Sequence, residues 1–299
     1  MGSRREELKV MPFEIIEIGA VKLDENLVET DRFSRLIRPR VYRRMHWANK
    51  KVVNIENSDL QDAEGFEMVY SEFLAFCGDD PYVFCTWGDT DLTELQRNIY
   101  YFDCLPLSEG PLEFLDIQKL NGYNNGSPKE RLSLEKAVEE YGIPENKGFH
   151  RAVNDAAYTV DIMKRIDRKY EIFTSFNTYH TPTDTESEVR RDYGTYTKHI
   201  THCFPDKTSL LHNKRIKTLT CPSCGRKIKK DLPLFTINGK NYLTMGECAV
   251  HGTVKSKIRI RKDELRGKPY AIKTTRLIND TEKTSVEEKY QKSISSKSE

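Results

Sequence analysis

Apolar residues along the first 170 positions fall into short runs typical of strands and longer periodic stretches typical of helices. The segment 13–23 (FEIIEIGAVKL) is apolar and β-branched. A turn-like Asp-Glu-Asn follows and separates it from a second such segment at 31–39, so we expect two adjacent strands. The compact segment 81–87 (PYVFCTW) predicts a further, buried strand.

Helices are predicted between and after these strands. In the segment 62–78, apolar side chains recur at helical spacing and Gly78 provides a stop. Helical patterns also occupy 91–102, 133–143 and 152–167. Strands followed by helices indicate a layered α/β domain, which we place at 12–170.

The rest of the chain has weaker patterns. Residues 171–215 carry polar side chains and scattered aromatics without a sustained period, and we interpret them as a connector. A small second domain is expected over 216–265. The tail 280–299 is rich in charged residues and serine, and we expect it to be disordered.

Length and composition indicate a soluble protein of about two domains. The chain has 299 residues, of which 37% are hydrophobic and 31% charged. It has neither an apolar run of about 18 residues nor a signal peptide, so we expect a cytoplasmic protein without a membrane segment. The seven cysteines are then expected to be reduced thiols or metal ligands rather than disulfides. The oligomeric state is not indicated.

The net charge of +2 conceals two opposite balances. Residues 1–170 hold 23 Lys and Arg against 31 Asp and Glu, whereas the remainder holds 25 against 15. The acidic part is suited to cations and the basic part to a polyanion. Nucleic acid is therefore the first partner to test.

A metal-binding pattern is the most specific signal in the chain. Two short knuckles, CPSCG at 221–225 and CAVHG at 248–252, contain the four residues Cys221, Cys224, Cys248 and His251. Four such ligands close a tetrahedral Zn²⁺ site, which is structural rather than catalytic. Between the knuckles, Asn238-Gly239 flanked by strand formers predicts a hairpin. The arrangement resembles a zinc ribbon.

A basic row follows the second knuckle. Alternate side chains of a strand share a face, so VKSKIRIRK would place four cations on one side: Lys255, Lys257, Arg259 and Arg261. Such a row suits a nucleic-acid backbone. It is equally typical of a solvated strand protected from aggregation by its charge, and both interpretations stay open.

The stretch FHRAVNDAAYT, residues 149–159, places His150 and Asp155 where a loop enters a helix. Histidine can accept a proton near neutral pH, and an aspartate in the first helical turn can hold a metal ion. By itself the pair is weak evidence of catalysis, because a histidine at this place is more often a cap or a surface residue.

Four segments occur in the order and approximate spacing of a known family: IIEIGAVKL, VFCTWGDTDLTEL, LSLEKAVEEYGI and GFHRAVNDAAYT. Over residues 12–170 the chain resembles the DnaQ-like, DEDDh class of 3′–5′ exonucleases, and within it the ERI-type and KapD-like subgroup. The resemblance implies an RNase H-like α/β fold and hydrolysis of phosphodiester bonds at DNA or RNA 3′ ends with Mg²⁺ or Mn²⁺. It implies that His150 is the general base and that Asp91 and Asp155 are metal ligands. Trp87, before the second motif, could stack a terminal base or belong to the core.

The family's first motif, Asp-x-Glu on an apolar strand, has no match in this sequence. Glu6 and Glu7 are adjacent and Glu14 and Glu17 are three apart, so neither pair would share a strand face. We therefore expect two of four metal ligands and a central strand to be missing, through truncation or loss of catalysis. Two hypotheses follow, an exonuclease and a catalytically inactive nucleic-acid-binding protein. A protein-binding scaffold has little support.

Overall fold

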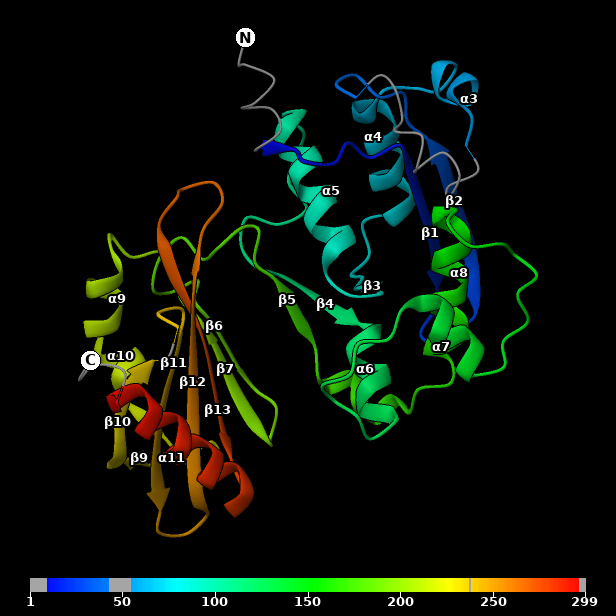
Figure 1. Ribbon diagram of the computed structural model, residues 1–299. Helices are drawn as coiled ribbons and strands as arrows, with labels where there is room; N and C mark the ends of the chain where they lie inside the picture. Colours follow the sequence, from blue (N-terminus) through cyan, green and yellow to red (C-terminus); the bar gives the residue numbers. More distant parts are fainter. Residues whose placement is uncertain (1–9, 43–54, 237, 296–299) are drawn as a thin grey trace. The chain divides into compact units, whose positions relative to one another are not determined.

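The chain folds into two compact units, as the computed structural model shows (Figure 1). The structure describes residues 10–42, 55–236 and 238–295. The first unit contains the chain up to residue 107 together with Leu112–Asn177, and the second contains Ser108–Pro111 and the chain from Thr178 onward.

Two small sheets form the centre of the first unit. Strand β1 (Glu17–Leu23) pairs antiparallel with β2 (Glu29–Leu36). Strand β3 (Phe84–Thr86) pairs parallel with β4 (Leu112–Asp116), which pairs antiparallel with β5 (Ser175–Asn177). Among the described residues no strand joins the two sheets, so β1 and β3 each keep one edge without a strand partner.

Helices cover these strands in two layers. The helices of the first unit are α3 (Asn57–Gln61), α4 (Phe66–Cys77), α5 (Thr90–Tyr101), α6 (Ile117–Asn124), α7 (Leu134–Glu140), α8 (Ala152–Met163) and the 3₁₀ helix η1 (Arg168–Ile172). One apolar core packs α4 and α5 against β1 and β2, and a second packs α6, α7 and α8 against Leu115 of β4. The four predicted helices and three predicted strands are all present, and α4 ends before Gly78 as expected.

The contact between β1 and α8 is close. A Cβ atom built on Gly19 of β1 would lie 2.1 Å from the backbone nitrogen of Val153 and 2.3 Å from the carbonyl carbon of Ala152. Only a residue without a side chain lets the first turn of α8 approach the strand this closely. Gly19 therefore sets the position of the helix that carries Asp155.

The second unit is built on an antiparallel sheet of order β10-β11-β12-β13-β7-β6. Its strands are β6 (Val189–Asp192), β7 (Tyr196–Ile200), β10 (Lys230–Thr236), β11 (Asn241–Cys248), β12 (Gly252–Lys262) and β13 (Pro269–Leu277). The short strands β8 (Leu219–Thr220) and β9 (Lys227–Ile228) form a separate hairpin. The helices are α9 (Lys207–His212), α10 (Lys214–Lys217) and α11 (Asp280–Ser295).

The two faces of this sheet pack differently. Side chains around α9 and α10, including Leu210 and Ile216, are buried against Tyr242 and Ile258 on one face. Helix α11 covers part of the other face, where Val286 packs against strands β10 and β11. The predicted hairpin around Asn238-Gly239 is present, since β10 and β11 pair antiparallel on either side of it.

The structure differs from the sequence-based expectation in three places. The expected connector, 171–215, contains β5, β6, β7, α9 and α10, because its short strands gain partners far away in the chain, such as Ile272 for Ile200. The tail expected to be disordered is helical over Asp280–Ser295, since Val286 finds an apolar partner surface. The ribbon expected at 216–265 shares its second hairpin with the six-stranded sheet.

None of the described helices is long and apolar enough to cross a membrane.

Candidate active site and metal centre

The loop before α8 turns back onto the helix that follows it. Its backbone passes through Gly148 with φ 71° and His150 with φ 67°, both in the left-handed region. The backbone N–H of His150 donates to Oδ1 of Asp155 at 3.2 Å. The loop is therefore closed onto the first turn of α8, with the His150 side chain exposed and Asp155 half-buried.

Glu17 anchors the start of the same helix. Its side chain is 5% exposed, and Oε1 accepts a hydrogen bond from Nη2 of Arg151 at 2.9 Å. Oε2 accepts the backbone N–H of Ala152 at 3.0 Å, which satisfies one of the free donors at the helix N-terminus. The sequence offers no signal for this role, because the partners are 134 positions apart.

Neither described N-terminal glutamate replaces the missing motif. Glu14 accepts backbone N–H groups from Arg40, Val41 and Tyr42. Glu17 is held by Arg151. Both carboxylates thus have structural partners. Glu6 and Glu7 lie outside the described residues.

Asp91 enters the first turn of α5 directly after β3, through a turn at Gly88 with φ 90°. Its carboxylate is accessible to solvent, yet the surrounding protein desolvates it enough to raise its pKa. Desolvation also raises the pKa of Asp155, while the hydrogen bond from His150 opposes this and the charges of Glu135 and Asp91 add to it. The charges of His150 and Asp91 therefore both act on the Asp155 carboxyl.

Two further carboxylates near these strands and helices were not expected. Glu135, in the first turn of α7, raises the pKa of Asp155 because α7 packs against α8. Asp116 ends β4 opposite Thr86, and burial raises its pKa. Its Oδ1 accepts the N–H of Lys119 at 2.9 Å, so it caps α6 rather than presenting a free ligand.

Asp91 and Asp155 are too few ligands for a pair of hard cations. Within residues 10–42, 55–236 and 238–295, the only group of three or more clustered His, Cys, Asp or Glu ligands is the cysteine-histidine cluster of the second unit. A two-ion site needs several oxygen ligands. Of the oxygen ligands that the resemblance implies, the described part of the chain contains two, Asp91 and Asp155.

Trp87 packs against the core formed by α6, α7 and α8. Its Nε1–H donates to the carbonyl oxygen of Leu132 at 3.1 Å, and its half-buried ring packs with the core of α6, α7 and α8. This placement favours the interpretation as a core residue over base stacking.

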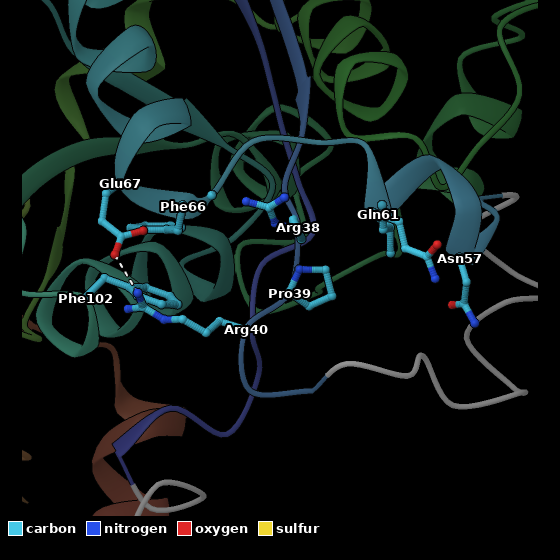
Figure 2. A pocket seen from close by; sticks show the side chains of 10 residues that line it. Arg38, Pro39, Arg40, Asn57, Gln61, Phe66, Glu67 and Phe102 are labelled. Carbon is cyan, nitrogen blue, oxygen red and sulfur yellow. Dashed lines mark ion pairs between the residues drawn. The ribbon is translucent and has the colours of Figure 1, made fainter. Parts of the chain in front are cut away.

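A pocket of about 500 Å³ lies elsewhere in the first unit, as Figure 2 shows. Arg40 is one of its walls, but the guanidinium pairs with Glu67 at 3.0 Å and stacks on the ring of Phe102 at 4.5 Å. None of the predicted catalytic residues lines this pocket. It is therefore not the site that the sequence indicated.

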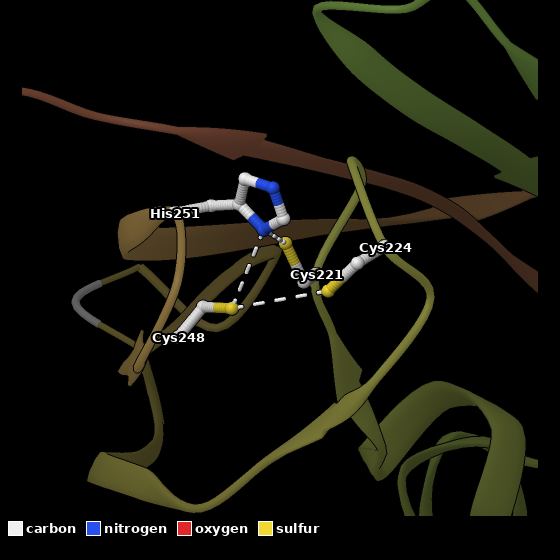
Figure 3. Close-up of side chains that lie close together, drawn as sticks. All are labelled: Cys221, Cys224, Cys248 and His251. Carbon is white, nitrogen blue, oxygen red and sulfur yellow. Dashed lines mark hydrogen bonds between the residues drawn. The ribbon is translucent and has the colours of Figure 1, made fainter.

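The four predicted ligands of the second unit converge (Figure 3). Sγ of Cys221 and Sγ of Cys248 lie 3.5 and 3.6 Å from Nδ1 of His251, and the Sγ atoms of Cys224 and Cys248 lie 3.9 Å apart. In a tetrahedral site with Zn–S of about 2.3 Å and Zn–N of about 2.0–2.1 Å, sulfur and nitrogen lie about 3.5 Å apart and two sulfurs about 3.8 Å apart. Three of the six distances between ligand atoms thus match the edges of a tetrahedral zinc site.

Local hydrogen bonds favour the thiolate form of Cys248. The backbone N–H groups of Val250 and His251 are directed at the sulfur of Cys248, and with the His251 ring they lower the pKa of the thiol to about 6. A thiolate is the form that binds metal. Cys221 and Cys224 come from the β8–β9 turn, whereas Cys248 ends β11 and His251 lies in the turn before β12.

The basic row after the second knuckle has the predicted alternation. Val254, Ser256 and Ile258 are buried, whereas the alternate positions Lys257, Arg259 and Arg261 are exposed. Lys255 is half-buried and lies 3.4 Å from Glu282 of α11. Three of the four cations are therefore available to solvent, and the fourth is paired.

The raised pKa of Asp91 leads to a stability prediction. A carboxyl whose pKa is higher in the folded than in the unfolded state destabilises the fold when it is ionised, and this cost disappears below the unfolded pKa. Asp91→Asn should therefore raise the melting temperature near pH 7, with the difference vanishing near about pH 3. Thermal unfolding of both proteins across this range is the measurement. A lower melting temperature of the variant near neutral pH would show that attraction to the N-terminus of α5 dominates instead.

Comparisons with known proteins cover the first part of the chain. Residues 7–163 match the protein-family model RNase_T, described as Exonuclease. The chain is 27% identical over 157 residues to the probable 3′-5′ exonuclease KapD of Bacillus subtilis, covering 52% of this chain and 74% of that protein. It is 26% identical over 153 residues to the DNA polymerase III subunit epsilon of Aquifex aeolicus, covering 51% and 71%. A solved nuclease domain of 3′hExo, a DEDDh family member bound to rAMP, matches with 20% identity and a TM-score of 0.46, covering 51% of this chain and 80% of that one.

Proposed function

Because this chain belongs to the exonuclease family whose model its residues 7–163 match, we propose that it acts on the 3′ ends of nucleic acids by metal-dependent hydrolysis. The RNase H-like α/β fold predicted for the first unit is confirmed by this membership, and its mixed strand pairing between helical layers agrees with it. The observation that carries the proposal is the hydrogen bond from the His150 N–H to Asp155 at the start of α8, where the charge of Asp91 also acts on the Asp155 carboxyl.

Each of these side chains has a role that its position suits. His150 is exposed, so its ring can reach and accept the proton of the attacking water. Asp155 is oriented by the His150 N–H, which leaves Oδ2 of its carboxylate for a cation. Asp91 adds a second carboxylate. Mg²⁺ or Mn²⁺ bound there would supply charge neutralisation for the phosphodiester.

The cysteine-histidine cluster has a structural role in this proposal. Four protein ligands leave no open position on Zn²⁺, so Cys221, Cys224, Cys248 and His251 would hold two hairpins together rather than react. The exposed cations Lys257, Arg259 and Arg261 beyond the cluster would contact the phosphate backbone of DNA or RNA.

A labelled-oligonucleotide assay tests the proposed function. Shortening of a 5′-labelled strand by single nucleotides, with Mn²⁺ and not with chelator, is the expected product pattern for 3′ to 5′ action. Asp155→Ala should remove whatever activity the chain has, and Asp184→Ala, at an exposed aspartate of the second unit, is the matched control. Internal cuts, or trimming that survives Asp155→Ala, would contradict the proposed site.

A second function is favoured by one observation. The described residues supply two carboxylates where paired hard cations need more. A chain with this ligand set would keep the fold and bind nucleic acid without hydrolysing it. Binding to an oligonucleotide that is recovered intact in Mn²⁺ is the result that distinguishes it.

A further inference from the structure

The side of the six-stranded sheet that α11 partly covers also carries several cations, and we call the group they form the basic face. Its members are Arg191 on β6, Lys198 on β7, Arg276 on β13, and Lys257 and Arg259 on β12. Paired residues of neighbouring strands lie on the same side of a sheet. The register pairs Arg191 with Lys198, Lys198 with Thr274, and Thr274 with Lys257, so a row of side chains crosses four strands.

The opposite side of these strands is the core. Ile258, Ala271 and Thr275 point away from the basic face and are buried. The strands are therefore held by packing on the buried side of the sheet, while Arg191, Lys257 and Arg259 are exposed on the basic face. The cations stand on regular strands rather than on loops, at separations of about 4.8 Å between strands and about 6.8 Å along them.

Acidic residues are scarce on this side. At the described positions of β6, β7, β12 and β13 that share the basic face, no Asp or Glu occurs. Glu282 of α11 pairs with Arg276 and Lys255 at one border. Partial desolvation lowers the pKa of Lys257, and the nearby charges of Arg259 and Lys289 lower it further. All charged side chains at these strand positions are therefore positive.

An aromatic pair lies at the β6–β7 end of the same face. Tyr196 pairs with Arg276 across the strands, and its half-buried ring stacks on that of Tyr193 with centroids 4.5 Å apart. Nζ of Lys198 lies 5.8 Å from the Tyr193 centroid. Cations beside an aromatic ring on a flat sheet are the elements with which proteins bind unpaired nucleotides, through phosphates and stacked bases.

We propose that the basic face binds single-stranded nucleic acid, with phosphates on Arg191, Lys198, Lys257 and Arg259 and a base against Tyr196. This deepens the proposed function, on which it rests for the choice of polyanion, by naming single strands as the substrate class and the second unit as the surface that holds them. It also extends the nucleic-acid contact from one strand, β12, to three, β6, β7 and β12.

Binding is best measured in the full chain carrying Asp155→Asn, which removes hydrolysis as a complication. Fluorescence anisotropy with a labelled oligouridylate and oligothymidylate, titrated at several salt concentrations, gives affinity and salt slope. Replacing Arg191, Lys198, Lys257 and Arg259 with Ser should weaken binding at least about tenfold and reduce the slope by roughly 3, at about 0.7 per lost single-strand contact.

A matched control removes four other exposed lysines of the second unit: Lys214, Lys217, Lys227 and Lys229. This variant has the same net charge as the first but should bind nearly as the parent does. Tyr196→Ala should weaken binding about tenfold without changing the salt slope, and Tyr196→Phe should restore it. Circular dichroism and zinc content confirm that each variant is folded.

Several results would overturn the basic face. One is an equal loss of oligonucleotide affinity in the two four-residue variants. Another is binding of duplex as tight as that of single strands. A third is protein that binds anionic vesicles containing phosphatidylserine but no oligonucleotide. Failure of the exonuclease assay is a separate outcome, because a chain that binds single strands through these residues and never trims them supports the basic face and refutes the proposed catalysis.

Discussion

Cys224→Ser protein should contain no bound zinc and should lose much of the folded structure of its second unit. The parent, prepared without chelator, should contain about one equivalent. The side chain of Cys224 belongs to the β8–β9 turn, whose hairpin has only two residues in each strand. So short a hairpin has little stability of its own, and binding free energies of structural zinc in small peptides reach about 10–16 kcal/mol.

The consequences of zinc loss should spread beyond the predicted ribbon. Cys248 ends β11 and His251 precedes β12, and these strands lie inside the six-stranded sheet. Metal analysis and thermal unfolding measure the effect, with Cys104→Ser as a control cysteine of the first unit. Full retention of zinc by Cys224→Ser, or parent protein without zinc, would refute the metal centre.

Joining a strand with an Asp-x-Glu motif to the start of the chain should raise metal-dependent trimming from near background to a readily measured rate. Strand β1 has an edge without a strand partner among the described residues, and the motif's spacing of two directs both carboxylates to one face. Four carboxylates instead of two would then be available to hold the cations. The oligonucleotide assay on both proteins, with Mn²⁺ or chelator, is the measurement.

Within the extended protein, His150→Ala should cost roughly 100-fold or more in rate, as expected for loss of a general base. The same motif with Asp and Glu replaced by Asn and Gln is the matched control, since it adds the strand without the charges. An extended protein that folds and binds oligonucleotides but stays inactive would favour the non-catalytic alternative. Strong activity of the parent chain would show that other residues supply the missing ligands.

Local patterns predicted the parts of the fold that depend on neighbours in sequence. The helical repeat and the stop at Gly78 gave α4, and the alternation after His251 gave the exposed cations of β12. The spacing of two knuckles identified four ligands that the fold brings within 4.8 Å of one another. In each case the residues that form the pattern lie within one short segment or within a pair of similar segments.

Long-range contacts could not be predicted in this way. Strands β6 and β7 are short and polar, and they are strands because β13 offers an edge to β7 and β7 offers one to β6. The ion pair between Glu17 and Arg151 joins distant positions that carry no shared motif. Helix α11 looks like a polar tail because its apolar contacts are few, among them Val286 and Tyr290. Such elements follow from tertiary packing rather than from local propensity.

The approach of β1 to α8 limits which amino acids position 19 can accept. Any side chain there begins with a Cβ atom at 2.1 Å from a backbone nitrogen, so even alanine requires the helix to move. Gly110 has no such restriction, because a Cβ atom at that position would meet nothing within 4 Å. Among variants selected for function, glycine should thus be retained at position 19, although this residue is not one of the proposed metal or nucleic-acid contacts. A library that randomises only the proposed polar site would not reveal this requirement.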